Sequence, residues 1–258
     1  MDLPAQIRSS LQNQGLPPPS LAWIRSALPN RNPLPPLPAL VATVKTRLLA
    51  ADLTNPTLFD LPAPVFPLDM SHPGVKEATL IRDTPVQVLD IENLSKSKWE
   101  QVEELEAIAR GEQTKGREII RLPNGNEDDE DTIDNQATQS AANGGERPGL
   151  QGRGGSAAIT NAASIVTKTS THRLVLQDCR GGKLYALELK RIDRIGIGTL
   201  NIGEKIILKR GTTIARGVLL LEPTNCTILG GKVEAWQRAW VESRLARLRE
   251  AVGADNRS

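Results

Sequence analysis

A stretch from Leu122 to Thr160, in the middle of this 258-residue chain, cannot build a hydrophobic core. Five consecutive acidic residues, Glu127 to Asp131, are followed by a glycine-rich tract with scattered arginines. Segments so poor in apolar side chains cannot bury enough surface to offset the chain entropy that folding removes. The stretch is therefore either a linker between two domains or a loop inserted into one, and the elements on its two sides decide between these alternatives.

One strand is predicted before this stretch and about four after it. The first, from Thr84 to Leu94, alternates apolar and polar residues. The later ones are "THRLVLQD", "LYALEL", "GEKIILKRG" and "RGVLLLEPTNCTIL". A single strand is not stable alone, and the later strands need partners for their edges. The economical solution is one five-stranded barrel with residues 111–169 inserted between its first and second strands. Such a long loop inside a compact domain is usually functional.

Helical patterns occupy both ends of the chain. Residues 1–62 predict a domain of three short amphipathic helices separated by prolines, and residues 63–83 predict an extended strap. A further helix follows the first strand, where Ser97 and Glu100 match a capping box. Residues 232–258 predict a closing helix and tail. The apolar residues that share a face of this closing helix are Val233, Trp236 and Trp240.

The sequence thus predicts an α+β fold, in which the helical domain and the strap precede a barrel domain over residues 84–231. A five-stranded barrel of this kind is typical of an OB-fold protein. OB folds that bind single-stranded DNA stack bases on aromatic side chains. Between Thr84 and Gly231 only Trp99 and Tyr185 are aromatic. The barrel therefore favours protein binding, with a single-stranded DNA-binding protein as the alternative and a scaffold with a passive loop as a third reading.

The bulk composition excludes several classes of protein. A formal net charge of +2 and a pI of about 8.6 do not predict a strong electrostatic binder of nucleic acid. Two cysteines without a CxxC pair argue against a disulfide framework and against a zinc site. The apolar runs are too short to span a bilayer, and the N-terminus lacks a signal-peptide pattern. We expect a soluble intracellular protein with no membrane partner.

No stretch of the sequence carries the signature of catalysis. The run "GIGTLNIGEK" resembles a phosphate-binding loop, but a glutamate precedes its lysine, Lys205. Ile206 then stands where that loop needs a metal-binding hydroxyl. His72 and His172 have no acid–base or metal-ligating residues near them in sequence. We predict no enzyme activity, no catalytic residue, no cofactor and no metal.

Several stretches together carry a family resemblance. They are "LLAADL", "PVQVLDIENLSKSKWEQVEELEAI", "THRLVLQDCRGGKLYALEL", "NIGEKIIL" and "RGVLLLEPTNCTILGGKVEAW". The most specific is the run from Gly217 to Val233, with the pattern GVLLL-x-P-x-N-x-x-x-LGG-x-V. In these stretches the chain resembles the RecQ-mediated genome instability protein 1 family. The similarity covers most of the chain outside the insertion, and the N-terminal helices match more loosely.

The resemblance implies a function without catalysis. Members of the family are nuclear, non-enzymatic subunits of a complex with topoisomerase III, a type IA enzyme, and a Bloom-type RecQ helicase. That complex resolves double Holliday junctions by dissolution, and DNA contact by the subunit itself is expected to be weak or indirect. The family's OB domain binds the topoisomerase, and its insertion modulates the DNA gate. Larger members carry a second OB domain; we expect this chain to be a short form without it, and therefore expect no partner of such a domain.

Two groups of residues are candidates for partner binding. Lys205 matches a lysine in the family's G-x-K run, and a solvated lysine at a strand edge is the open alternative. Lys209 and Arg210 carry the same ambiguity. Within the insertion, the apolar residues could contact the partner or pack back on the barrel; they are Ile119, Ile120, Leu122 and Pro123.

Other residues are predicted to support the fold. We expect a core or structural role for Trp99, Gly217, Leu220, Pro223, Gly230 and Gly231. On the closing helix, Trp236 and Trp240 are expected to cap the open end of the barrel. Its arginine-rich face could contact DNA or a partner, through Arg238, Arg244, Arg247 and Arg249.

Overall fold

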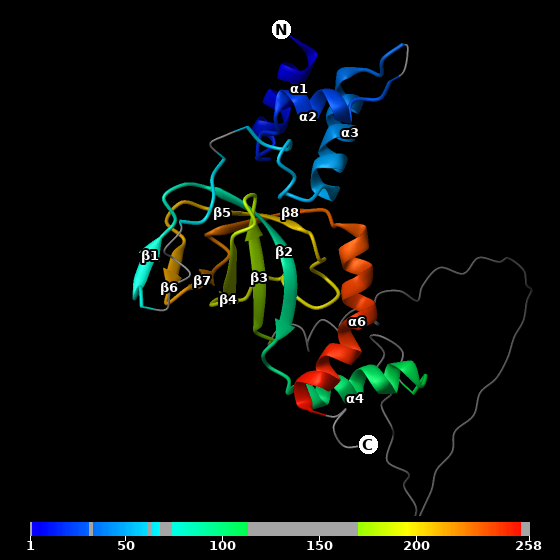
Figure 1. Ribbon diagram of the computed structural model, residues 1–258, viewed down its shortest axis with the longest axis vertical. Helices are drawn as coiled ribbons and strands as arrows, with labels where there is room; N and C mark the ends of the chain where they lie inside the picture. The colour runs from blue at the N-terminus through cyan, green and yellow to red at the C-terminus, as the bar shows by residue number, and fades with distance from the viewer. Residues whose placement is uncertain (1, 31–32, 61–62, 68–73, 113–169, 254–258) are drawn as a thin grey trace, which may run out of the picture.

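A helical domain stands at one end of the molecule and a curled β-sheet follows it (Figure 1). The structure, a computed structural model, describes residues 2–30, 33–60, 63–67, 74–112 and 170–253. The predicted anchor residues Ile119, Ile120, Leu122 and Pro123 therefore lie outside the described residues, as does His72.

Three helices form the N-terminal domain: α1 (Leu3–Asn13), α2 (Leu21–Ala27) and α3 (Leu37–Ala50). Prolines stand in the first turn of α1 and α3, where a missing N–H costs nothing. The Ser20 hydroxyl caps α2 by accepting a hydrogen bond from the Trp23 N–H at 3.0 Å. The domain buries its own apolar core, made mainly by Ile7, Leu11, Ile24, Leu40, Val44, Leu48, Leu53 and Leu58.

One sheet of eight strands makes the second domain, in the order β1-β6-β7-β4-β3-β2-β5-β8. The bounds are β1 (Glu77–Thr79), β2 (Thr84–Asn93), β3 (His172–Asp178), β4 (Lys183–Glu188), β5 (Lys205–Leu208), β6 (Thr213–Ala215), β7 (Val218–Leu221) and β8 (Cys226–Gly230). All neighbours are antiparallel except β4 and β7, which are parallel. Residues facing inward along these strands fill the core of an OB-fold barrel.

The sheet curls because the two outer edges of the consecutive strands β2, β3 and β4 both pair with one long hairpin. β5 leads into β6 and β7 leads into β8, so the hairpin's outer half pairs with β2 and its inner half pairs with β4. Asn225 fixes the corner between the halves. Its carbonyl accepts the Lys209 N–H at 2.8 Å, and its side-chain amide donates to the Leu220 carbonyl at 2.8 Å while accepting the Glu222 N–H at 2.9 Å. Because of this corner, a single hairpin can pair with β2 through one half and with β4 through the other.

The α+β class, the helical domain, the OB fold and the closing helix are confirmed, but the strand count differs from the prediction. The predicted last strand, from Arg216 to Leu229, is two strands, because the Asn225 corner interrupts the pairing. β1 and β6 are three-residue strands that pair with each other, and such short runs show no alternation for a pattern to reveal. β1 also falls within the stretch predicted as strap.

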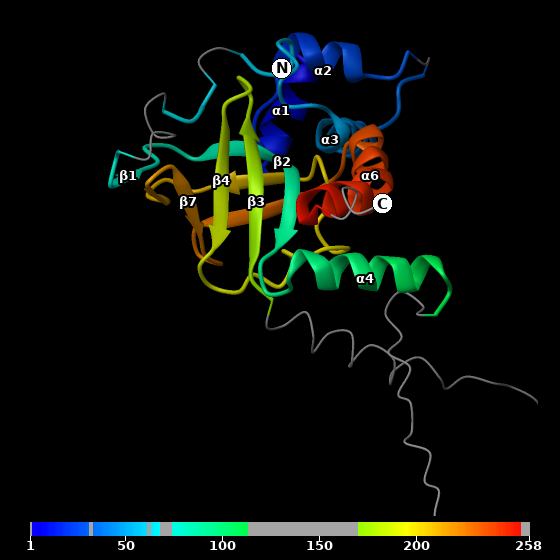
Figure 2. The same cartoon turned by 60° about the horizontal axis from the view of Figure 1, so that its bottom comes forward.

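Two helices flank the barrel: α4 (Lys98–Ala109) and α6 (Glu234–Val252). α4 starts with the predicted capping box, in which both Ser97–Glu100 hydrogen bonds are present. α6 begins against the barrel, where Trp236 and Trp240 pack on the core as expected. The end of α6 lies beside α4 (Figures 1 and 2).

Two residues predicted for the core lie outside it. Trp99 is 51% exposed, and its ring N–H donates to Glu103 Oε1 at 2.8 Å on the same helix. In the described part of the chain α4 packs mainly on α6, and its buried residues are Gln101 and Val102 rather than Trp99. Leu220 is half-buried and points outward, because the alternation of β7 sends its two neighbours inward.

The glycines of the family-like run serve two different purposes. Gly217 (φ 82°) sits with Arg216 (φ 49°) in the two-residue turn between β6 and β7, where positive φ at both positions suits the twist of the hairpin. Gly231 (φ 84°) lies against the end of α3, and a Cβ there would be 2.4 Å from the Leu49 carbonyl oxygen. This close approach joins the helical domain to the barrel. Gly230 precedes it as the last residue of β8, and Pro223 is exposed in the turn after β7.

Candidate partner-binding surfaces

The insertion leaves and rejoins the barrel at one end of β2 and β3. The described chain runs from β2 through α4 to Glu112 and resumes at Ser170, just before β3. The Leu94 N–H donates to the Thr171 carbonyl at 2.9 Å. Because β2 and β3 are paired neighbours, the chain between them is an insertion into one sheet rather than a link between two domains.

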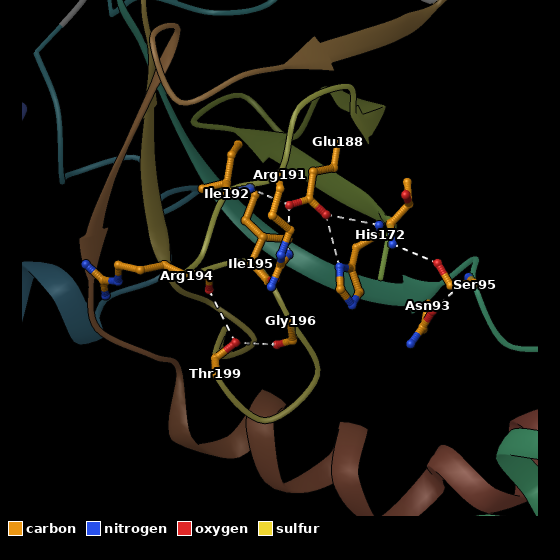
Figure 3. A network of polar contacts seen from close by, with 11 residues as sticks. Asn93, Ser95, His172, Glu188, Arg191, Ile192, Arg194, Ile195, Gly196 and Thr199 are labelled. Atoms are coloured by element: carbon orange, nitrogen blue, oxygen red, sulfur yellow. Dashed lines mark hydrogen bonds and ion pairs between the residues drawn. The ribbon is translucent and has the colours of Figure 1, made fainter. Parts of the chain in front are cut away.

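A buried carboxylate fixes the point where the chain returns (Figure 3). Glu188, at the end of β4, receives the His172 N–H at 3.2 Å and faces the ring Nδ1 of His172 at 3.0 Å through the same oxygen. Its other oxygen accepts the Ile192 N–H at 2.6 Å and an Arg191 guanidinium N–H at 2.8 Å. Both Glu188 and His172 are almost fully buried. They bind the first residue of β3 to the loop that follows β4.

Hydrogen bonding outweighs burial at this carboxylate. Burial alone would raise the pKa of Glu188, but hydrogen bonds from His172, Ile192 and Arg191 lower the pKa below its ordinary value. The carboxylate therefore stays ionised and fully bonded, which is the arrangement in which a buried charge is tolerated. The contacts described for its side chain are all to the barrel itself, so we interpret Glu188 as a residue that holds the fold.

The departing side of the insertion is held by α6. Arg249 reaches Glu106 of α4 with its Nη2 at 2.7 Å and its Nε at 3.0 Å. Arg244 Nη2 lies 3.4 Å from Gln101 Oε1. Three of the four arginines predicted as a DNA or partner face, Arg244, Arg247 and Arg249, thus contact the protein itself, and the charge of the fourth, Arg238, acts on Glu234 of the same helix.

A shallow groove lies between α6 and the end of β2. The Trp240 ring N–H donates to Asp90 Oδ1 at 2.5 Å, and Arg247 pairs with Asp90 Oδ2 at 3.3 Å. The guanidinium groups of Arg244 and Arg247 each lie 5.5 Å from the Trp240 ring centre. The groove holds about 190 Å³, below the roughly 300–1,000 Å³ of ordinary small-molecule sites.

The seam between the two domains centres on Gln87, a fully buried amide on β2. Its Oε1 accepts the Leu53 N–H at 2.9 Å, and its Nε2 donates to Asp52 Oδ1 at 2.7 Å and to Gln177 Oε1 at 3.0 Å. Asp52 and Leu53 follow α3, whereas Gln177 belongs to the barrel. Burial would raise the pKa of Asp52, but the hydrogen bonds from Gln87 and Thr54 lower it.

Lys205 lies at the same seam, and the structure contradicts both readings of it. The residue is 2% exposed, so its side chain neither contacts a partner nor forms a solvated strand edge. Its ammonium donates to the Gly203 carbonyl. Burial lowers the pKa of Lys205 to about 8, against the opposing influence of the Asp52 and Glu204 charges. The strand places this position inward, toward the seam, where sequence gives no warning of a buried cation.

Lys209 and Arg210 lie in the corner between β5 and β6, and both are exposed. The Lys209 ammonium donates to the Thr224 carbonyl at 2.9 Å, and the Arg210 N–H donates to Asp83 Oδ1 at 2.7 Å. The Arg210 side chain and the remaining donors of Lys209 face solvent. Their part in partner binding stays a prediction.

No group of three or more His, Cys, Asp or Glu side chains in the described ranges is placed to hold a metal ion. None of the helices in the described part is long and apolar enough to cross a bilayer.

Fold and insertion together define the class: an OB-fold protein with an N-terminal helical domain and a long insertion between the first two barrel strands. Two family descriptions match in the same order, "RMI1, N-terminal helical domain" over residues 11–56 and "RMI1, N-terminal OB-fold domain" over residues 66–244. The chain belongs to the RMI1 family. It is also 27% identical over 202 residues to RecQ-mediated genome instability protein 1 of Schizosaccharomyces pombe, covering 77% of this chain and 74% of that protein.

Membership of this family supports a role in genome stability with RecQ, and the RMI1 family is not a known enzyme family. The residues that organise the described surfaces include three that sequence reasoning passed over: Gln87, Glu188 and Asn225. Each is a polar residue inside or beside an apolar strand, where a polar side chain must find partners. That mismatch is the signal that could have singled them out, although it names no partner.

Proposed function

We propose that this protein is a non-enzymatic subunit that docks on topoisomerase III and acts with a RecQ-type helicase in decatenation and in the dissolution of double Holliday junctions. The barrel supplies the docking energy, and the insertion biases the DNA gate of the topoisomerase. Family membership and the printed name of the fission-yeast relative support the RecQ connection. The expected place of action is the nucleus, and direct contact with DNA is expected to be weak.

The fixed root of the insertion is the observation that carries the proposal. The chain departs along α4, which Arg249 clamps to α6, and returns at β3, which Glu188 clamps to the loop after β4. The insertion therefore departs from and rejoins the barrel domain at points that side-chain contacts hold in place. It regulates a gate only if it has different affinities for the open and closed forms.

Single-stranded DNA binding remains the rival function, and one observation favours it. Tyr185 is half-exposed on the outside of the barrel, and the Arg173 guanidinium lies 4.9 Å from its ring centre. An aromatic ring beside an arginine is one unit of a base-stacking surface. Trp99 lies on α4 and not on a barrel strand, so a platform of several rings is not assembled. A steep loss of oligonucleotide binding with salt would favour this rival.

The test compares the whole chain with a variant that lacks residues 116–167. Both are titrated with the cognate topoisomerase III and then added to a decatenation assay. Tight binding by both, with decatenation altered only by the whole chain, would support docking by the barrel and gating by the insertion. Binding by neither would reject the proposal. Equal decatenation with both would reject the gating role and leave a passive scaffold.

A further inference from the structure

The outside of the barrel carries an apolar patch on three adjacent strands. Tyr185 of β4 pairs with Val175 of β3 and with Val218 of β7, and Leu187 of β4 pairs with Leu220 of β7. Cross-strand partners lie on the same side of a sheet. We call this patch the β4 face; with Leu189, which follows β4, its members are Val175, Tyr185, Leu187, Leu189, Val218 and Leu220.

The β4 face is apolar, whereas the outward face of a barrel in water is normally polar. In an antiparallel barrel, inward residues are apolar and outward residues are polar. Here the inward positions of β4 and β7 are buried, as expected, at Leu184, Ala186, Leu219 and Leu221. The outward positions are apolar too, and Tyr185 and Leu189 are 50% and 56% exposed. A contiguous exposed apolar patch of this kind marks an interaction site.

No helix of the described chain covers the β4 face. In Figure 2, β3 and β4 run across the front of the barrel with no helix before them, while α1 to α3 lie at one end and α4 and α6 lie on the β2 side. The contacts of the helices agree, since α6 reaches the barrel through Asp90 of β2 and the helical domain through Gln87 of β2 and Gly231.

Cations surround the patch. Lys183, at the start of β4, and Arg216, in the turn before β7, are exposed, and no ion pair joins either to another described residue. Arg173 lies over Tyr185 and pairs with Glu92, while Lys190 pairs with Glu222 at 2.8 Å. An apolar surface with two unpaired cations at its rim, Lys183 and Arg216, fits a partner whose apolar side chains are flanked by carboxylates.

We propose that the β4 face is the docking surface for a protein segment of that chemistry, apolar in its centre and acidic at its ends. This inference rests on the proposed function, in which the segment belongs to topoisomerase III. Binding would bury the six apolar side chains of the face and place carboxylates against Lys183 and Arg216. Truncation at the centre of such an interface has larger effects than change at its rim.

The composition of the face disfavours two other occupants, single-stranded nucleic acid and a second copy of this chain. Single-stranded nucleic acid needs successive aromatic rings, and the face offers one ring among aliphatic side chains. A second copy of this chain, docked face to face, would bring Lys183 and Arg216 against equivalent cations. Like charges juxtaposed across an interface are unfavourable.

The test uses full-length protein with the doubly substituted Tyr185→Ser/Leu189→Ser variant. The matched control is Ile81→Ser/Val241→Ser, which removes two apolar side chains elsewhere that are also more than half exposed, at 70% and 53%. Thermal unfolding verifies that both variants fold. Affinity for the cognate topoisomerase III is expected to fall by about tenfold or more in the first variant and to stay within about twofold in the control. Lys183→Glu is expected to weaken binding less than the Tyr185→Ser/Leu189→Ser variant does, and its effect should be larger at low salt than at high salt.

The possible failures are distinguishable. If the unsubstituted protein does not bind topoisomerase III, the proposed function falls, and this inference falls with it. If it binds and the Tyr185→Ser/Leu189→Ser variant binds equally well, the function stands and the β4 face is not the docking surface. If that variant loses only binding to an oligo-dT strand, the face is a nucleic-acid site. If it loses only self-association in sedimentation, the face joins two copies of the chain.

Discussion

Two buried charges on the same barrel respond in opposite ways to burial. At Glu188 the pKa of the carboxyl is lowered despite burial, because N–H donors from three residues converge on its two oxygens. At Lys205 burial prevails, and the pKa of the ammonium falls to about 8 although Asp52 and Glu204 lie close enough to oppose the shift. A buried charge is stabilised by converging hydrogen bonds more than by the mere presence of opposite charge.

The two pKa values respond differently because the Glu188 and Lys205 clusters join different parts of the molecule. Glu188 connects segments of a single barrel, where register fixes every donor in place. Lys205 lies at the seam between two domains. There Gln87, not Lys205, makes the hydrogen bond to the helical domain, and one acceptor, the Gly203 carbonyl, is described for the ammonium. We therefore expect the Glu188 cluster to contribute more to stability and the Lys205 cluster to respond more to pH near neutrality.

Removal of the Glu188 carboxylate is expected to give the largest effect. Glu188→Ala leaves the buried His172 and Ile192 N–H groups without their acceptor, and the Arg191 guanidinium keeps only its bond to the Ile195 carbonyl. Breaking a buried charged network in this way costs about 3–5 kcal/mol, measurable as the free energy of unfolding in urea. The matched control is Glu222→Ala, which breaks the exposed pair with Lys190 and should cost less than about 1 kcal/mol. Equal losses in the two variants would contradict the comparison.

Ionisation of the same carboxylate should make the free energy of unfolding depend on pH in the acid range. Its folded pKa is below its unfolded pKa of about 4.5, so its contribution is present above that value and disappears as pH falls through the folded pKa. The gap between wild type and Glu188→Ala should therefore narrow in acid.

The seam is tested next by Gly231→Ala. The new Cβ would meet the Leu49 carbonyl oxygen at 2.4 Å and would also occupy a left-handed φ. Overpacking and left-handed strain together cost about 2–4 kcal/mol. Gly230→Ala is the control, because its φ is also positive but its nearest contact, Arg194 Nη2, is 4.0 Å away. The difference in the free energy of unfolding isolates the close approach of the two domains, and no difference would show that α3 can move aside.

A smaller loss is expected when the amide at the seam is removed. Gln87→Ala leaves the Leu53 N–H without its buried acceptor and removes a donor from Asp52. An unsatisfied buried group costs about 1–3 kcal/mol. Gln177→Ala removes the hydrogen bond between the two amides and a long one to the Gly181 carbonyl, but leaves the Leu53 and Asp52 contacts of Gln87 in place, and should cost less. Proteolysis near Asn55 should accelerate in the Gln87 variant if the helical domain loosens from the barrel, and unchanged proteolysis would place the loss within the barrel alone.

The parts of this fold that can be predicted from sequence are those that depend on residues close together in the chain. Alternation reveals β3 and β4, and the Ser97–Glu100 box places the start of α4, because both depend on neighbours in the chain. The insertion could be assigned to one barrel because unpaired strands on its two sides need each other. Lys205 could not be placed, since the same spacing suits an exposed lysine and one that meets Asp52, a residue more than 150 positions away. The core predictions for Leu220 and Trp99 were wrong for a related reason. An apolar side chain is buried only where another part of the fold covers it.

The smallest effect at neutral pH is expected from Lys205→Met, a substitution of similar volume that removes the charge. Replacing a poorly paired buried ion by an apolar side chain is often neutral or stabilising, so the change at pH 7 should stay within about 1 kcal/mol. The pH profile separates the two proteins. Between pH 8 and 10.5 the unfolded chain keeps the Lys205 proton while the folded protein releases it, so the stability of the wild type rises with pH relative to the variant. Parallel profiles of unfolding free energy across that window would mean that the ammonium stays charged in the fold, and Lys205 would then resemble Glu188 instead of contrasting with it.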